Sequence, residues 1–108
     1  MAEAWEYYHT PRAQYPTAPG FATVRSLTQL IAYDAYCKAE SFLTQPLQIV
    51  VGSEAGSKWM SDDLYRRAAS QQKNLHVVKG ANHMSLYDVS PCIEEAVQVL
   101  GDFFNKYL

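Results

Sequence analysis

His83 is the residue of this sequence best suited to acid–base chemistry. It stands in the stretch LHVVKGANHMSLYD, residues 75–88, just after an apolar run that ends at a glycine. A histidine at such a place either makes a structural hydrogen bond or moves a proton, because the ordinary pKa of imidazole lies near neutral pH. The other histidines, His9 and His76, lie in a Pro-rich N-terminal segment and inside the apolar run, and we interpret both as structural.

Glu54 is the best candidate for an acid that works with His83. Residues 46–52 and 74–78 have the apolar, β-branched composition of buried strands, and a helical stretch separates them. Such a β-α-β unit has parallel strands, whose carboxyl ends meet at one edge of the sheet. Glu54 follows the first strand as His83 follows the second. The pair is therefore expected to supply a general base and the carboxylate that orients it, as in a Ser-His-Asp/Glu arrangement.

A nucleophile to accompany this pair is missing from the sequence. The G-x-S-x-G elbow of α/β hydrolases is absent, and GSEAG, residues 52–56, has a glutamate at its centre. Ser53, Ser57 and Ser85 are poor substitutes, because none is expected on a strand-to-helix elbow. We therefore expect the chain by itself to form no covalent acyl intermediate.

The elements that position these residues follow from hydrophobic periodicity and from turn residues. Residues 1–25 form an aromatic, Pro-rich strap whose first residues could make a short helix. Residues 26–40 are predicted as a helix, with Ser26 as its N-cap, and residues 46–108 as a β-α-β-α unit. The fold class is α/β. Two parallel strands this apolar need neighbours, so we expect part of a larger doubly wound sheet or a sheet completed by self-association.

The sequence also predicts the starts of two helices and a structural role for Asp34. Ser61 is the expected N-cap of the helix between the strands, and the last helix is expected to run from Pro91 to the C-terminus. Asp34 falls on the apolar face of the first predicted helix. A carboxylate in that place is expected to accept hydrogen bonds from backbone amides at a helix or loop junction.

Composition excludes several classes of function. The chain has 108 residues, enough for one domain, and a formal net charge of −2, which argues against nucleic-acid binding. No apolar run reaches the roughly 18 residues of a membrane span, so we expect a soluble, cytoplasmic protein. Cys37 and Cys92 match no zinc spacing and are expected to be reduced thiols. No metal site and no cofactor are expected.

The order of several blocks resembles the C-terminal part of α/β hydrolases. The similar group is the dienelactone-hydrolase-like and acyl-peptidase-like one, which includes polyketide-transferase-like hydrolases. The resemblance covers essentially the whole chain, and its blocks are YYHTPRAQYPTAPGFATVRSLTQLIAYDAY, PLQIVVGSEAGSKWMSDDLYRRAA, LHVVKGANHMSLYD and FFNKYL. It implies that residues 46–52 and 75–79 are the last two strands of a doubly wound, mostly parallel hydrolase sheet.

The resemblance also implies roles for site residues. His83 falls on the family's catalytic histidine in its G-A-x-H segment. Many relatives carry an aspartate three residues after the strand-ending glycine, where this chain has Ala55, so Glu54 is the best substitute. The alternative acids that stay open are Asp62, Asp63 and Asp34.

Two functions from different classes follow. In the first, the chain is the C-terminal segment of a serine-type α/β hydrolase that cleaves a small-molecule ester or related acyl bond, with His83 and Glu54 as catalytic residues and the serine elsewhere. In the second, it is a non-catalytic interaction domain derived from such a hydrolase, a homo-oligomer that pairs open sheet edges between chains.

Overall fold

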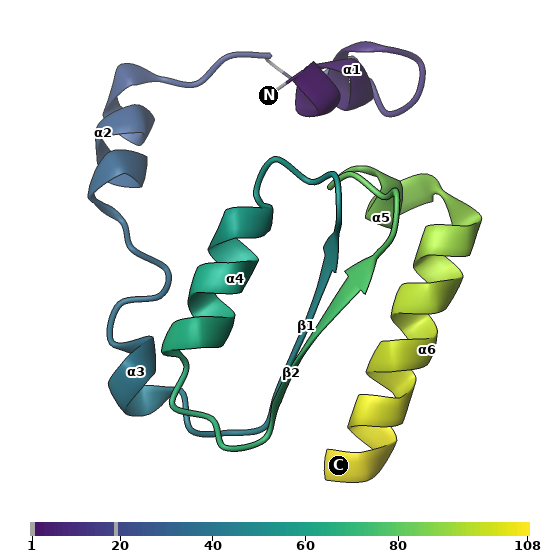
Figure 1. Ribbon diagram of the computed structural model, residues 1–108. Coiled ribbons are helices and arrows are strands. Elements are labelled where there is room, and N and C mark those ends of the chain that lie inside the picture. The colour runs from purple at the N-terminus through teal and green to yellow at the C-terminus, as the bar shows by residue number, and fades with distance from the viewer. Residues whose placement is uncertain (1, 19) are drawn as a thin grey trace. The chain divides into compact units, whose positions relative to one another are not determined.

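The chain consists of two units, which the computed structural model describes over residues 2–18 and 20–108. The first unit is Met1–Cys37 and the second is Lys38–Leu108. The second unit contains both strands of the structure and the candidate residues from Glu54 onward (Figure 1).

The centre of the second unit is a parallel pair of strands. Strand β1 (Leu47–Gly52) pairs with β2 (Lys73–Val78) over their full lengths, and Gly52 lies opposite Val78 at the carboxyl ends. Helix α4 (Lys58–Arg67) connects the two strands. The predicted α/β class and the predicted parallel β-α-β unit are therefore confirmed, with strand boundaries within two residues of those expected.

Helices cover both faces of this small sheet. Helices α4 and α6 (Ser90–Tyr107) each pack against both strands, and Figure 1 shows them on opposite sides of the strands. The apolar stripe of α6 recurs with helical spacing. Its half-buried members are Ile93, Ala96, Leu100, Phe103 and Tyr107.

The strands are less buried than their sequences suggest. We expected burial on both faces, but β1 is fully buried only at Val51 and Gly52, and β2 only at Val78. The reason is that the sheet has two strands in the described part of the chain, so each strand has one open edge. The buried core is correspondingly small and consists mainly of short side chains: Ala39, Val51, Ala55, Ala68, Val78, Ala81 and Met84.

Helix α4 begins earlier than the sequence predicted. Ser57, not Ser61, occupies the N-cap position, and the helix starts at Lys58. Tight backbone turns after β1 cause the early start, because the N–H of Ala55 bonds the carbonyl of Gly52 and that of Lys58 bonds the carbonyl of Ala55. The chain is thereby already coiled when it reaches Lys58.

The predicted helix over residues 26–40 is interrupted. Helix α2 (Val24–Ala32) starts at an N-cap made by Thr23, whose Oγ1 accepts the Ser26 N–H at 3.2 Å. The helix ends because Asp34 Oδ1 accepts the Tyr36 backbone N–H at 2.9 Å, a local turn that competes with helix. That contact is the backbone role predicted for Asp34. A separate short helix, α3 (Ala39–Phe42), belongs to the second unit.

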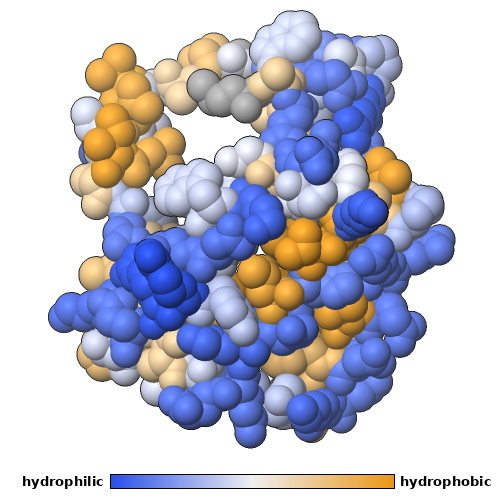
Figure 2. Space-filling model, in the orientation of Figure 1, coloured by the Kyte–Doolittle hydropathy of each residue, from blue (hydrophilic) through white to orange (hydrophobic). Residues whose placement is uncertain are grey.

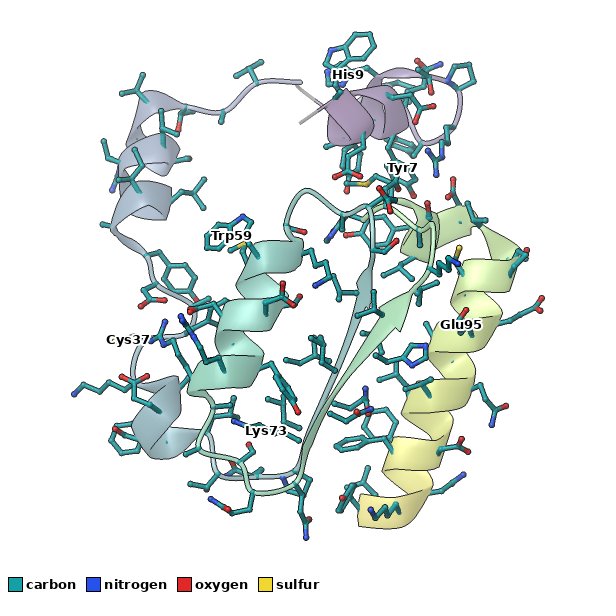
Figure 3. All side chains as sticks on the ribbon, viewed as in Figure 1. Tyr7, His9, Cys37, Trp59, Lys73 and Glu95 are labelled. Atoms are coloured by element: carbon teal, nitrogen blue, oxygen red, sulfur yellow. The ribbon has the colours of Figure 1, made fainter. Side chains whose placement is uncertain are left out.

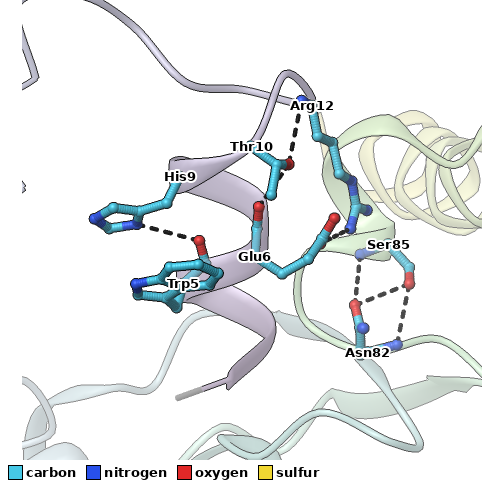
Figure 4. Close-up of polar contacts among 7 residues, drawn as sticks. All are labelled: Trp5, Glu6, His9, Thr10, Arg12, Asn82 and Ser85. Atoms are coloured by element: carbon cyan, nitrogen blue, oxygen red, sulfur yellow. Dashed lines mark hydrogen bonds and ion pairs between the residues drawn. The ribbon is translucent and has the colours of Figure 1, made fainter.

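The first unit also contains a short N-terminal helix, α1 (Ala2–His9), as the sequence allowed. The end of α1 is tied by an ion pair of 2.8 Å between Arg12 and Glu6, and by a 3.1 Å contact between His9 Nδ1 and the Trp5 carbonyl (Figure 4). These contacts are local, which agrees with a structural role for His9.

Helix α2 has a strongly apolar face that is exposed. Figure 2 shows apolar side chains gathered on this helix. They are Val24, Leu27, Leu30 and Ile31, each more than half exposed. No helix in residues 2–18 and 20–108 combines the length and the apolar character needed to cross a membrane.

Charged side chains join α3 to α4 at the surface of the second unit. Arg67 pairs with Glu40 and with Asp63, each at 3.2 Å, and Asp63 also pairs with Arg66. The pKa of Asp63 is lowered by hydrogen bonds from Arg66 and then Arg67. The pKa of Glu40 is lowered by a backbone hydrogen bond and then by Arg67. This cluster therefore favours the ionised carboxylates in the folded state.

The first prediction concerns Gly52. A Cβ at this position would lie 2.1 Å from the Ala81 carbonyl oxygen and 2.6 Å from its carbon, and backbone atoms cannot move aside cheaply. Gly52→Ala should therefore lower the free energy of unfolding by about 2–3 kcal/mol, measured by urea denaturation. The matched control is Gly101→Ala, in open space on α6, which should raise it by about 0.5–1 kcal/mol. Equal midpoints for Gly52→Ala and the wild type would contradict the close approach.

The second prediction concerns pH. Arg67→Met should lower the urea midpoint near neutral pH, because Glu40 and Asp63 lose a partner for their charged forms. Their folded pKa values lie below the ordinary 4.5 and 3.8, so their contribution is present above those values and disappears as pH falls through the lower folded ones. The difference between variant and wild type should thus shrink on acidification. Arg25→Met serves as control, because Arg25 makes no ion pair among the described residues; a pH-independent difference for Arg67→Met would refute the assignment.

Candidate functional site

The loops after the two strands are joined at the carboxyl edge of the sheet, as predicted. The backbone N–H of Ser53 bonds the carbonyl of Val78, and the N–H of Glu54 bonds the carbonyl of Ala81, both at 2.9 Å. Gly52 permits this approach because a larger residue would collide with Ala81. Every side chain of the candidate site is carried by these two loops or by the helices that follow them.

His83 is half-buried at this edge, and both of its ring nitrogens have hydrogen-bonding partners. Nδ1 lies 3.3 Å from Ser57 Oγ, and Nε2 lies 2.7 Å from the Tyr87 hydroxyl. The His83 and Tyr87 rings meet edge to face, with centroids 5.3 Å apart. The imidazole is therefore held between a hydroxyl from the start of α4 and a phenol from the short helix α5 (Ser85–Asp88).

Glu54 has a different place from the one expected. Its carboxylate is exposed and accepts a hydrogen bond from Ser53 Oγ at 2.9 Å. Ser53 Oγ in turn accepts the Gly80 backbone N–H at 2.9 Å, so these groups tie the two loops together. Among the described residues, Glu54 makes no hydrogen bond or ion pair with His83. The group that faces Nδ1 is the hydroxyl of Ser57.

The alternative acids are engaged elsewhere. Asp62 forms an i,i+4 ion pair with Lys58 at 2.7 Å, and Asp63 belongs to the arginine cluster of α3 and α4. Asp34 holds the Tyr36 N–H in the first unit. Each of these carboxylates thus has a local structural partner.

The turn that carries His83 is itself tightly built. Asn82 Oδ1 accepts hydrogen bonds from the backbone N–H and the hydroxyl of Ser85, both at 2.9 Å, and Ser85 Oγ accepts the Asn82 N–H at 3.2 Å (Figure 4). Ala81 and Met84, which flank Asn82 and His83, are buried. This reciprocal arrangement fixes the backbone on both sides of His83.

Tyr87 is the site residue that the sequence reasoning missed. Its position four residues after His83 brings two side chains together only when the intervening residues are helical. The sequence predicted no helix between the strand at 74–78 and Pro91, whereas α5 occupies part of that segment. The i,i+4 spacing was the available signal.

Other polar residues and hollows of the second unit lie apart from His83. His76 Nε2 contacts Glu95 Oε1 at 2.6 Å and links β2 to α6, where Figure 3 labels Glu95. A groove of about 580 Å³ lies at the amino ends of the strands, between residues such as Lys73, Asn74 and Phe103. Neither His83 nor its partners line this groove. No group of three or more potential metal-ligating side chains occurs in residues 2–18 and 20–108.

Comparison with known proteins places the chain within longer relatives. No family model matches it. It is 67% identical over 108 residues to the uncharacterized protein YcjY of Escherichia coli and 32% identical over 113 residues to the uncharacterized protein PA2218 of Pseudomonas aeruginosa. These alignments cover all of the chain but 35% and 29% of the relatives, so the chain spans about a third of their length.

A solved structure shares the fold. The crystal structure of hypothetical protein PA2218 from Pseudomonas aeruginosa superposes with a TM-score of 0.62 at 22% identity. The match covers 99% of this chain and 33% of that chain. An arrangement like this one therefore occurs within a polypeptide about three times as long.

The third prediction tests the turn around His83. Asn82→Ala removes the acceptor for both Ser85 donors and should cost about 1 kcal/mol of unfolding free energy, measured by urea denaturation. Asn82→Asp is the matched control, because it keeps the acceptor oxygen, and should retain most of the stability. If both variants lost the same amount, the hydrogen bonds to Oδ1 would not be the stabilising feature.

Proposed function

We propose that this chain is the C-terminal part of a serine-type α/β hydrolase and carries the catalytic histidine of that enzyme. The observation that carries the proposal is the position of His83. It stands at the carboxyl end of β2, in a rigid turn, with hydrogen-bonding partners at both ring nitrogens. A general base of this kind needs one nitrogen for the nucleophile and the other for an orienting group.

The same proposal includes the larger sheet to which the two strands belong. In it, β1 and β2 are the last two strands of a doubly wound, mostly parallel sheet. The open edges and half-buried strands support this idea, because parallel strands are normally covered by neighbours. The relatives, about three times as long as the chain, have room for the remaining strands.

The proposed chemistry is ester or related acyl-bond hydrolysis. His83 Nε2 takes the proton of a serine hydroxyl that lies outside residues 1–108, while the serine oxygen attacks the carbonyl carbon of a small-molecule substrate. The protonated imidazole then gives its proton to the leaving alcohol, and water hydrolyses the acyl-enzyme by the same route. No cofactor is needed for these steps.

The orienting acid in this scheme remains Glu54. Its carboxylate would have to leave Ser53 and reach Nδ1, where Ser57 now lies. Both serines are on the loop that also carries Glu54. A cytoplasmic location is part of the proposal and is supported by the free thiols of Cys37 and Cys92.

One observation favours a second candidate function. The two strands leave open edges within the described residues, and open edges can pair with strands of another chain. A non-catalytic domain that oligomerises through these edges would use β1 and β2 for assembly and would leave His83 without a chemical role.

The fourth prediction separates these functions. A chimera of the Escherichia coli relative, with its matching third replaced by residues 1–108, should react with a fluorophosphonate at a serine outside this segment and hydrolyse p-nitrophenyl esters. His83→Ala in the chimera should reduce kcat by at least about 10³-fold, because the general base is lost. His76→Ala is the matched control and should leave kcat nearly unchanged, since His76 contacts Glu95 away from the site.

The isolated chain provides the complementary measurement. Alone it should give no burst with p-nitrophenyl esters and no fluorophosphonate adduct. A folded chimera that takes up no fluorophosphonate, or a His83→Ala chimera with undiminished kcat, would rule out the hydrolase proposal. A discrete oligomer in size-exclusion chromatography, together with an inert chimera, would support the interaction domain.

A further inference from the structure

The hydrogen bonds at the two ring nitrogens of His83 differ in length, and this difference bears on which nitrogen carries the proton. Nε2 lies 2.7 Å from the Tyr87 hydroxyl, whereas Nδ1 lies 3.3 Å from Ser57 Oγ. A neutral imidazole carries one proton, so one nitrogen donates and the other accepts. Either tautomer can satisfy both contacts, because each hydroxyl can donate or accept.

The chemistry of the two hydroxyls favours one of the tautomers. A phenol, with an ordinary pKa of about 10, gives up its proton more readily than an aliphatic alcohol and is therefore the stronger donor. Bonds donated by O–H are typically about 2.7–2.8 Å long, whereas those donated by N–H are nearer 2.9–3.0 Å. The short contact is best described as Tyr87 O–H donating to Nε2, and the long one as Nδ1–H donating to Ser57.

The turn around both residues favours a role for Tyr87 in positioning the His83 ring. Both residues belong to one turn of chain, in which the Tyr87 N–H bonds the Met84 carbonyl at 3.0 Å. The hydrogen bonds between Asn82 and Ser85 fix the start of that turn. His83 and Tyr87 therefore keep their spacing whenever this turn is formed, whereas Ser57 comes from a distant part of the sequence.

We propose that Tyr87 is a positioning residue that holds His83 in the tautomer with its proton on Nδ1 and its lone pair on Nε2. A general base acting through Nε2 requires this tautomer, and the serine hydroxyl has to replace the Tyr87 hydroxyl at Nε2 before it can transfer its proton. The importance of Tyr87 for catalysis rests on the proposed function, but the tautomer itself is a property of the chain. The hydroxyl of Ser57 accepts a hydrogen bond from Nδ1–H and takes the position of an orienting group.

The fifth prediction is tested by nitrogen NMR. In the ¹⁵N-labelled 108-residue chain at about pH 8.5, where an ordinary imidazole is neutral, long-range ¹H–¹⁵N spectra should show the His83 proton on Nδ1. Tyr87→Phe removes only the hydroxyl and should produce a substantial fraction of the Nε2–H tautomer. Ser57→Ala should leave Nδ1–H dominant, because Tyr87 still donates to Nε2.

Controls make the result specific. Tyr65→Phe removes a phenol hydroxyl on α4 and should leave the His83 spectrum unchanged, while dispersed amide signals show that each variant is folded. A wild-type Nε2–H tautomer, an unchanged Tyr87→Phe spectrum, or a tautomer that switches only with Ser57→Ala would overturn the proposal. If Tyr87→Phe failed to fold, Nδ1–H retained in Ser57→Ala would still support the role of Tyr87. An inert chimera would refute the hydrolase function and leave this tautomer result intact.

Discussion

The close passage of the backbone at the carboxyl ends of β1 and β2 is the constraint on which the candidate site depends. Gly52 has no side chain, and the carbonyl of Ala81 occupies the space that a Cβ would need. The loops then exchange backbone hydrogen bonds, from Ser53 to Val78 and from Glu54 to Ala81. Val78, which is 2% exposed, is buried at this junction. Without this approach, the loop that carries Ser57 and the turn that carries His83 would not be held together.

The site built on this junction has an unexpected distribution of charge. Two partners of the His83 ring nitrogens are hydroxyls, from Ser57 and Tyr87, whereas the candidate carboxylate of Glu54 serves the loop junction through Ser53. A hydroxyl can fix the orientation and tautomer of an imidazole, but it cannot stabilise an imidazolium as a carboxylate does. The two hydroxyls therefore orient the ring, and an acid at Nδ1 would be needed for full general-base strength.

Much of the second unit could be predicted, because its elements are strongly patterned. The β-branched runs, the amphipathic stripe of α6 and the glycine at or near the end of each strand are local signals that agree with the final packing. The predicted helix boundaries are wrong where local turns compete with the regular helix. Asp34 caps a turn that ends α2, Lys38 adopts a left-handed backbone conformation with φ 59°, and backbone turns after Gly52 start α4 at Lys58. Periodicity alone does not reveal such breaks, since the apolar pattern continues through them.

The sequence by itself determined the class of the fold, the order of its strands and helices, and the edge at which His83 and Glu54 emerge, because these follow from hydrophobic period and from the geometry of parallel strands. Only the tertiary structure decided which groups meet. The direction of the Glu54 carboxylate depends on Ser53, whose hydroxyl is held by the N–H of Gly80, 27 residues further along the chain. The partners of His83 depend on the start of α4 and on the helical turn of α5. The contacts of Ser57 with His83 and of Ser53 with Gly80 join distant segments, so no spacing in the chain encodes them, whereas the i,i+4 contact of Tyr87 depends on a helical turn at α5.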